Sequence, residues 1–248
     1  MIDRRRLILG SGSALLLGGC DRLNGNPAFR DVLRSAEGLT MRAQRLVSDR
    51  AALAREFSEG DMSPIFRSNG TRMPDTPAYA RYLAEGFANY RLQVDGLVAR
   101  PLSLSLEQIR ALPMRTQITR HDCVEGWSAI GKWHGLPLGM LLKQAGLSTR
   151  ARYVVFHCMD QSGGRPYYES IDLIDAFHPQ TILAWGMNNR VLDVPHGAPL
   201  RLRVERQLGY KHAKYVARIE AVDSLRRIHG GRGGFWEDGS DYEWYAGI

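Results

Sequence analysis

Cysteine is scarce in this sequence, which has 248 residues and only three cysteines, Cys20, Cys123 and Cys158. A fold stapled by several disulfides is therefore excluded, as is a zinc site of four cysteines. One disulfide between Cys123 and Cys158 remains possible if the protein works in an oxidising compartment. Hydrophobic residues make up 44% of the chain, so a sizeable core can stabilise the fold instead.

Long hydrophobic runs are also missing. A membrane-spanning helix needs ~20 apolar residues, and the run from Leu7 to Gly19 is shorter than that. It follows Arg4, Arg5 and Arg6, and this combination is typical of an export signal. The paired arginines indicate the pathway that exports folded proteins, and a general secretory signal with a basic start is the alternative.

The apolar run ends in Leu17-Gly18-Gly19-Cys20, which is similar to the lipobox of bacterial lipoproteins. We therefore predict that residues 1–20 are an export signal with a lipobox-like end. A lipid on Cys20 would hold the protein at a membrane, whereas cleavage nearby with an incidental cysteine is the alternative. The expected location is the periplasm, with an anchor at Cys20.

Motifs for binding nucleic acid, such as a zinc finger or an aromatic RNA-binding signature, are absent from the sequence. The net charge is nevertheless +7, so an anionic ligand or an anionic surface is expected. Five cations fall in one stretch and favour a local anion site: Arg201, Arg203, Arg206, Lys211 and Lys214.

Repeats and low-complexity segments are missing too, and many short strands with few short helices predict an α+β domain with a mixed β core. Residues 21–59 are polar and helical in pattern, which predicts a helical N-terminal arm or a partner surface. Residues 60–248 are predicted to form one domain that starts with an irregular loop at 63–77. Strands are expected at 90–96, 102–105, 117–123, 153–158, 182–185, 200–204 and 214–222, and short helices near 106–112, 138–146 and 172–176.

The first chemical constellation surrounds Cys123, which ends a predicted strand and enters a Glu125-Gly126-Trp127 loop. A thiolate is a soft ligand that suits a metal, and Arg120 and His121 are placed to lower the pKa of Cys123. A buried cysteine or one in a disulfide is the commoner arrangement, so both alternatives stay open here.

The second constellation is a basic strand with the loop that follows it. Arg201 and Arg203 alternate, so they share one face of the strand. The loop 209–214 adds Lys211, His212 and Lys214, and such converging donors suit a phosphate. A solvated strand with Glu205 as an ion-pair partner is the alternative.

Taken in order, these motifs resemble the molybdopterin domain of the sulfite-oxidase family over about residues 60–225. The resemblance rests on several short matches, namely 123–128, Trp133, 135–138, 197–201, 209–211 and Lys214. It implies a sulfite-oxidase-type fold and a molybdenum–molybdopterin cofactor. Cys123 matches the residue that ligates molybdenum in that family.

The resemblance also implies further contacts with the cofactor, from Asn69, Cys158, His196, Arg201, His212 and Lys214. Two of these positions depart from the sulfoxide-reductase branch of the family, because Cys158 stands in place of a threonine and His196 in place of an asparagine. The departures concern the substrate more than the cofactor.

The implied activity is an exported oxidoreductase that moves an oxo group to or from a sulfur compound such as sulfite or a sulfoxide. Arg120 or His121 is expected to neutralise an anionic substrate or to move a proton. The electron partner is expected to be a membrane cytochrome b or a soluble cytochrome c. A non-catalytic, lipid-anchored, anion-binding β domain is the alternative.

Two further segments have an open role. The aromatic C-terminal residues 235–245 cover the mouth of the site, dock a partner or pack on the core. Asp160 and Tyr167 follow the strand 153–158, where they line a pocket or serve the structure.

Overall fold

The computed structural model describes residues 26–240 and 242–248. The export signal and the lipid attachment at Cys20 lie outside these residues. The chain forms two compact units, Met1–Ser48 and Asp49–Ile248, and each is described by itself. The predicted functional boundaries at residues 20 and 59 stay predictions.

One helix, α2 (Pro27–Val47), forms the described part of the first unit. The Asn26 side chain caps its start by accepting a hydrogen bond from the Ala28 N–H at 3.0 Å. The predicted helical arm is therefore shorter than 21–59. Residues after Asp49 run extended instead, because Phe57 N–H donates to Ile118 O at 2.9 Å and Glu56 forms a β-bridge with Thr119.

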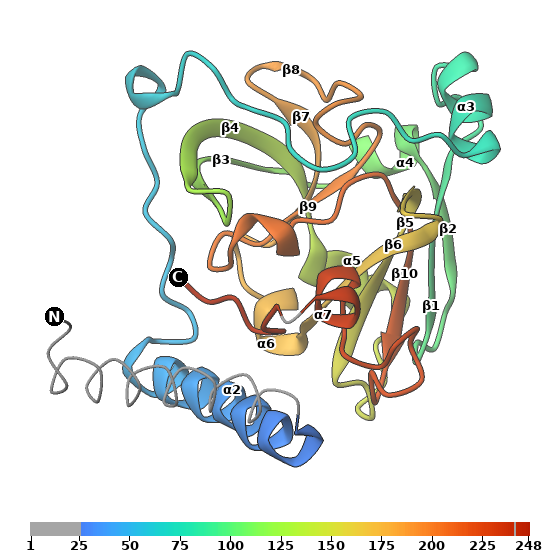
Figure 1. Ribbon diagram of the computed structural model, residues 1–248. Coiled ribbons are helices and arrows are strands. Elements are labelled where there is room, and N and C mark those ends of the chain that lie inside the picture. The colour runs from blue at the N-terminus through green and yellow to red at the C-terminus, as the bar shows by residue number, and fades with distance from the viewer. Residues whose placement is uncertain (1–25, 241) are drawn as a thin grey trace, which may run out of the picture. The chain divides into compact units, whose positions relative to one another are not determined.

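The second unit contains two five-stranded sheets with short helices around them, which confirms the α+β expectation (Figure 1). The first sheet has the order β2-β1-β10-β5-β6. Its strands are β1 (Arg91–Gly96), β2 (Leu102–Ser105), β5 (Tyr153–Ser162), β6 (Arg165–Asp172) and β10 (Val216–Val222). The apolar strand predicted at 153–158 lies inside this sheet, paired with β10 and β6, and its residues Val154–Phe156 are buried.

The second sheet has the order β3-β4-β7-β8, with β9 also paired to β7. Its strands are β3 (Arg115–Cys123), β4 (Trp127–Pro137), β7 (Ile182–Met187), β8 (Arg190–Val191) and β9 (Arg201–Arg203). Strands β3 and β4 form a hairpin in which Cys123 pairs with Trp127. Strand β4 was not predicted, because its glycines weaken a strand pattern. Gly135 is needed there, since a Cβ would lie 2.2 Å from the Leu183 carbonyl oxygen.

The helices are short. They are α3 (Pro77–Ala84), α4 (Leu106–Arg110), α5 (Leu138–Ala145), α6 (Leu173–Ala176), α7 (Phe235–Gly239) and the 3₁₀ turns η1 (Glu59–Asp61) and η2 (Gly209–Lys211). Helices α4, α5 and α6 lie close to the positions predicted for them, whereas α3, α7 and the two 3₁₀ turns were not predicted. Ser105 caps α4 and left-handed Gly146 ends α5, both as expected. Residues 62–76 contain no helix or strand, which confirms the irregular loop.

One hydrophobic core joins the two sheets of the second unit. It takes buried residues from both sheets and from α5, among them Leu92, Phe156, Ile219, Leu136, Leu202 and Leu141. Strands β5 and β9 contribute residues to this core, so the loops that follow them have fixed starting points. Within the part of the chain that the structure describes, no helix is long and apolar enough to cross a membrane.

Candidate active site

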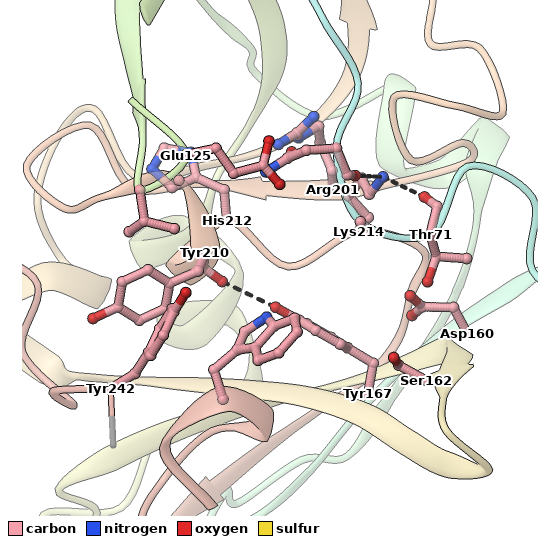
Figure 2. A pocket seen from close by; sticks show the side chains of 15 residues that line it. Thr71, Glu125, Asp160, Ser162, Tyr167, Arg201, Tyr210, His212, Lys214 and Tyr242 are labelled. Atoms are coloured by element: carbon pink, nitrogen blue, oxygen red, sulfur yellow. Dashed lines mark hydrogen bonds between the residues drawn. The ribbon is translucent and has the colours of Figure 1, made fainter. Parts of the chain in front are cut away.

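A cavity of about 320 Å³ opens where several distant segments of the second unit meet (Figure 2). Its walls come from the loop 69–71, the hairpin turn at 124–125, the end of β5, Arg201 of β9, the segment 209–214 and the C-terminal segment. These segments are far apart in sequence, so the cavity is a product of the tertiary fold.

Cys123 ends β3 directly before Val124 and Glu125, which line the cavity, and is itself 6% exposed and not among the lining residues. The Asn69 side-chain amide donates to its Sγ at 3.0 Å, and the Glu125 backbone N–H donates to it as well. Burial raises the pKa of the thiol, while the Glu125 N–H lowers it. Two donors aimed at one sulfur suit a thiolate, and burial means that the thiolate needs a positive partner such as a metal. Cys123 and Cys158 are both free, so the alternative disulfide is not formed.

Arg201 and Lys214 bring positive charge into the cavity. Arg201 donates to the His196 carbonyl oxygen at 3.0 Å and lies over the Trp133 ring, but its buried Nε has no partner among the described residues. Burial and the nearby Arg203 lower the pKa of Arg201 to about 9. The Arg201 Nε therefore remains to be satisfied by an acceptor, and an anion fits that need.

Lys214 holds the loop that carries Asn69. Its Nζ donates to the carbonyl oxygens of Asn69 at 2.8 Å and Pro195 at 3.1 Å, and also to that of Thr71. Burial, followed by the charge of Arg201, lowers the pKa of Lys214 to about 7. An anion between Arg201 and Lys214 would relieve this repulsion and favour the charged ammonium.

Two further polar groups face the cavity with unused hydrogen-bonding capacity. His212 Nε2 lies 3.0 Å from the Gln207 carbonyl oxygen, so Nε2 carries the proton and buried Nδ1 is an acceptor without a partner among the described residues. Asp160 bonds to the Thr71 side chain, and its Oδ1 likewise has no partner there. Burial raises the pKa of Asp160 to about 6. Asp160 and Tyr167, whose role was open, both line the cavity.

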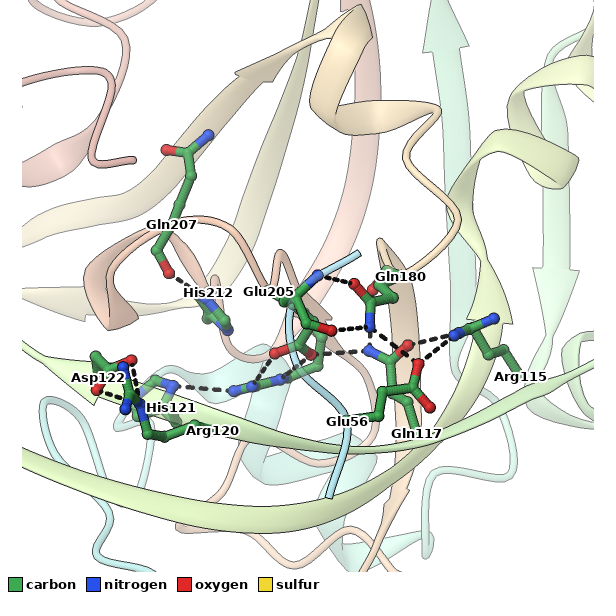
Figure 3. A network of polar contacts seen from close by, with 12 residues as sticks. Glu56, Arg115, Gln117, Arg120, His121, Asp122, Gln180, Glu205, Gln207 and His212 are labelled. Atoms are coloured by element: carbon green, nitrogen blue, oxygen red, sulfur yellow. Dashed lines mark hydrogen bonds and ion pairs between the residues drawn. The ribbon is translucent and has the colours of Figure 1, made fainter. Parts of the chain in front are cut away.

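The roles predicted for Arg120 and His121 need correction. Arg120 lies on the opposite face of β3 from Cys123, is exposed, and pairs with Asp122 at 2.9 Å. His121 is buried beneath the cavity and accepts from Arg203 Nη1 at its Nδ1, at 2.9 Å (Figure 3). A guanidinium can only donate, so Nδ1 is unprotonated. Burial and Arg203 hold the pKa of His121 well below 6.5, and a neutral ring cannot neutralise an anionic substrate.

Only part of the predicted basic cluster faces an anion site. Arg201 and Arg203 share one face, as expected, since both lie over Trp133. Arg203, however, makes a buried bidentate pair with Glu205 at 2.9 and 2.6 Å. The alternative interpretation was therefore right that Glu205 is an ion-pair partner, but this part of the strand is buried and not solvated. Arg206 donates to the carbonyl oxygens of Asp49 and Arg50 instead.

Two of the predicted cofactor residues do not present their side chains to the cavity. Cys158 packs against the core with its Sγ 3.9 Å from the Phe156 carbonyl oxygen. The His196 ring contacts Asp193 at 2.6 Å and the Phe66 carbonyl oxygen at 3.1 Å, so His196 reaches the site through its own carbonyl oxygen. Asn69, Arg201, His212 and Lys214 are brought together as predicted.

A buried ion cluster behind the cavity was not expected from the sequence. Lys211 Nζ lies 2.6 Å from Glu169 Oε2 and 2.5 Å from Glu237 Oε1, with all three side chains essentially inaccessible. Burial and Glu237 raise the pKa of Glu169, while Lys211 opposes the shift. The cluster ties β6, η2 and α7 together. The sequence neighbours Tyr210, His212 and Trp236 line the cavity, so the C-terminal segment both packs on the core and covers the site.

The chain is similar to known molybdopterin-binding oxidoreductases and to sulfoxide reductase subunits. Residues 80–228 match the family model "Oxidoreductase molybdopterin binding domain". The chain is 42% identical over 160 residues to the putative protein-methionine-sulfoxide reductase subunit YedZ1 of Azospira oryzae, covering 64% of this chain and 56% of that protein. It is 31% identical over 236 residues to the protein-methionine-sulfoxide reductase catalytic subunit MsrP of Xanthomonas campestris, covering 90% and 71%.

Among solved structures, the fold resembles the sulfane dehydrogenase SoxCD from Paracoccus pantotrophus. The TM-score is 0.51 and the sequence identity 24%, over 60% of this chain and 45% of that one. The chain thus spans little more than half the length of the YedZ1 relative and less than half of the SoxCD chain.

The neutral state of His121 predicts a pH dependence of stability. Below pH ~6.5 the unfolded chain protonates this histidine and the native protein does not, so the free energy of unfolding falls as the pH is lowered from 6.5. His121→Asn keeps an oxygen acceptor for Arg203 but cannot titrate. We expect urea unfolding between pH 5 and 7 to show a slope smaller by about one proton in this variant. An unchanged slope would contradict the assignment.

The buried cluster predicts a large effect of Lys211→Met. Removing the cation leaves Glu169 and Glu237 facing each other without compensation, so we expect a loss of about 3–5 kcal/mol in the free energy of unfolding. Arg150→Met is the matched control, because Arg150 forms an exposed pair with Asp223 and contributes little. Equal losses in the two variants, measured by urea unfolding, would show that the cluster has no such role.

Proposed function

The chain belongs to the oxidoreductase family defined by a molybdopterin-binding domain, and we propose that it reduces sulfoxides, with protein-borne methionine sulfoxide as the substrate class. The observation that carries the proposal is the set of residues that meet at Cys123. The names of the relatives MsrP and YedZ1 support the choice of methionine sulfoxide.

The residues present fit a molybdopterin cofactor. Cys123 offers a buried sulfur with two donors and suits a molybdenum ion. Arg201 and Lys214 supply two cations for the phosphate group, and the unpartnered Arg201 Nε supplies a further donor. His212 Nδ1 offers an acceptor for an N–H or O–H of the pterin. Bound molybdenum supplies the two-electron change that accompanies exchange of an oxo group with a sulfur compound.

The charges around the cavity favour a sulfoxide over sulfite. Arg201 and Lys214 are the cationic side chains among the described residues that line the cavity, and a phosphate would use both. Arg120 and His121, which were the candidates for binding an anionic substrate, lie elsewhere. Val124, beside Cys123, is 42% exposed, and Trp236 and Tyr242 add aromatic surface. A neutral methionine sulfoxide suits such walls better than an anion.

The chain's own groups prepare the site for this reaction. Reduction of a sulfoxide takes up two electrons and two protons and releases water. Asp160, with its pKa raised to about 6, is a carboxyl in the cavity that can hold a proton near neutral pH. Trp236 and Tyr242 restrict the access of water to the same space.

The location and the electron partner complete the proposal. The arginine-led signal and the lipobox-like Cys20 support export to the periplasm and attachment to a membrane. A membrane cytochrome b is then the natural electron donor, and a soluble cytochrome c is the second candidate. The alternative of a non-catalytic anion-binding domain is set aside, because the family is one of oxidoreductases.

The role of Cys123 predicts a specific loss in Cys123→Ala. The variant should lose activity and the thiolate-to-metal absorption, because no other described side chain offers a sulfur at that place. Cys158→Ala is the matched control and should keep both, since its thiol packs against the hydrophobic core with Sγ 3.9 Å from the Phe156 carbonyl oxygen. Absorption spectra and metal analysis of the two purified holoproteins check this. Retention of activity and absorption by Cys123→Ala would show that another group binds the metal.

The substrate preference is tested by a redox-dye assay of the metal-loaded protein. We expect oxidation of a reduced dye by methionine sulfoxide to exceed dye reduction by sulfite by at least ~100-fold in kcat/KM, because Arg201 and Lys214, the described cations that line the cavity, would be taken up by the phosphate. Faster turnover of sulfite would overturn the proposed reaction while leaving the cofactor assignment intact.

A further inference from the structure

The helix α2 of the first unit exposes large apolar side chains from Val32 to Val47. Leu39 is 63% exposed, Leu46 is 87% and Val47 is 85%, and Val32 and Leu33 are also more than half exposed. Large aliphatic side chains in such number and continuity mark a binding surface rather than scattered surface residues. No part of the proposed function uses this surface.

The apolar residues of α2 share one side of the helix. At about 100° per residue, Phe29, Val32, Ala36, Leu39, Ala43 and Leu46 fall within an arc of roughly a third of the circumference. Met41 lies on the opposite side of the helix, and Arg42 lies at the border of the apolar arc, about 40° beyond Leu46. The helix sequence contains four arginines but only one aspartate and one glutamate, so it is basic as well as amphipathic.

These properties identify the chemistry of the surface that α2 fits. With six charged residues among 21, the helix is too polar to cross a bilayer. None of the described helices, α2 included, is both long and apolar enough to span a membrane. A basic helix with a continuous Phe, Val and Leu face matches the class that lies in the plane of an anionic membrane surface. The apolar side chains then enter the acyl boundary while arginines meet the lipid phosphates.

The position of α2 in the chain supports the same partner. The helix begins at Pro27, seven residues after Cys20, and seven extended residues span at most about 25 Å. A lipid on Cys20 would therefore keep α2 within reach of the bilayer. This support rests on the proposed anchor, whereas the apolar face and the basic charge do not depend on it.

We propose that α2 is a membrane-surface helix that binds anionic phospholipid bilayers through Val32, Leu39 and Leu46. Together with a lipid chain it provides a second attachment, and two attachments are what stable anchoring of a peripheral protein requires. The helix thereby holds the second unit at the membrane where an electron donor resides.

The test uses the full-length holoprotein with Cys20→Ala, which removes the lipid, and vesicles of phosphatidylcholine with or without phosphatidylglycerol. Co-flotation should show binding to the anionic vesicles, and Leu39→Gln should weaken it about tenfold, since one buried leucine is lost without a change of charge. Met41→Gln is the matched control on the other side of the helix and should change binding less than twofold. Arg42→Gln should weaken binding to anionic vesicles and leave binding to neutral ones unchanged.

Amide hydrogen exchange supplies a second readout that does not depend on other lipid-binding segments. Residues 27–47 should gain protection when anionic vesicles are added to the parent protein, and Leu39→Gln should reduce that gain. Equal flotation of the Leu39 and Met41 variants, or no gain in protection, overturns the proposal. So does a vesicle-free dimer that Leu39→Gln dissociates, because the face would then bind a second copy. Molybdenum content and dye-linked activity should stay unchanged in both variants, which separates this test from that of the proposed function.

Discussion

The buried pair of Arg203 and Glu205 is the interaction on which the site depends. Both side chains are fully inaccessible, and their two hydrogen bonds satisfy a charge that would otherwise be very costly to bury. The pair also forms hydrogen bonds with strand β3. Arg203 donates to His121, and Glu205 accepts from Gln117 at 2.8 Å (Figure 3). It therefore fixes β9 against β3, the strand that ends in Cys123.

This pairing decides which cations remain for a ligand. Arg203 is neutralised by Glu205, and Lys211 by Glu169 and Glu237, so neither is left for an external anion. Among the described residues, Arg201 and Lys214 lack such a paired carboxylate, and burial together with neighbouring positive charge lowers their pKa values to about 9 and about 7. Because the neighbouring cations already have carboxylate partners, Arg201 and Lys214 are the ones that an anionic group would stabilise. That arrangement fits a phosphate-bearing cofactor better than a general polyanion surface.

The pairing of these charges also bears on the proposed substrate. Once a phosphate takes Arg201 and Lys214, the wall near Cys123 consists of Val124, Glu125 and aromatic rings, which suit a neutral sulfur substrate. The C-terminal segment contributes two of those rings, and the Lys211 cluster fixes it in place. The proposed binding of the cofactor and the proposed orientation of the substrate therefore depend on the same structural contacts.

The sequence by itself determined the local elements and the chemistry of single residues. Ser105 and Gly146 set helix ends, the alternation of Arg201 and Arg203 gave them one face, and the motif around Cys123 indicated a metal thiolate. These features depend on nearest neighbours and on period, which a sequence displays directly. The strand β4 was not predicted because its glycines are explained only by contacts with distant segments, Gly135 by the close approach of β7 and Gly131 by that of Phe66.

Only the tertiary structure decided which of the chemically competent residues act together. Arg120 and His121 flank the same strand end as Cys123, yet one faces solvent and the other is buried against Arg203. Cys158 and His196 lie close to the site without lining it, whereas Asp160 and Trp236 do line it. The physical reason is that partner choice for a charge depends on side-chain direction and on acids and bases brought from distant segments. Neither the direction of a side chain nor its distant partners can be read from the residues next to it in the sequence.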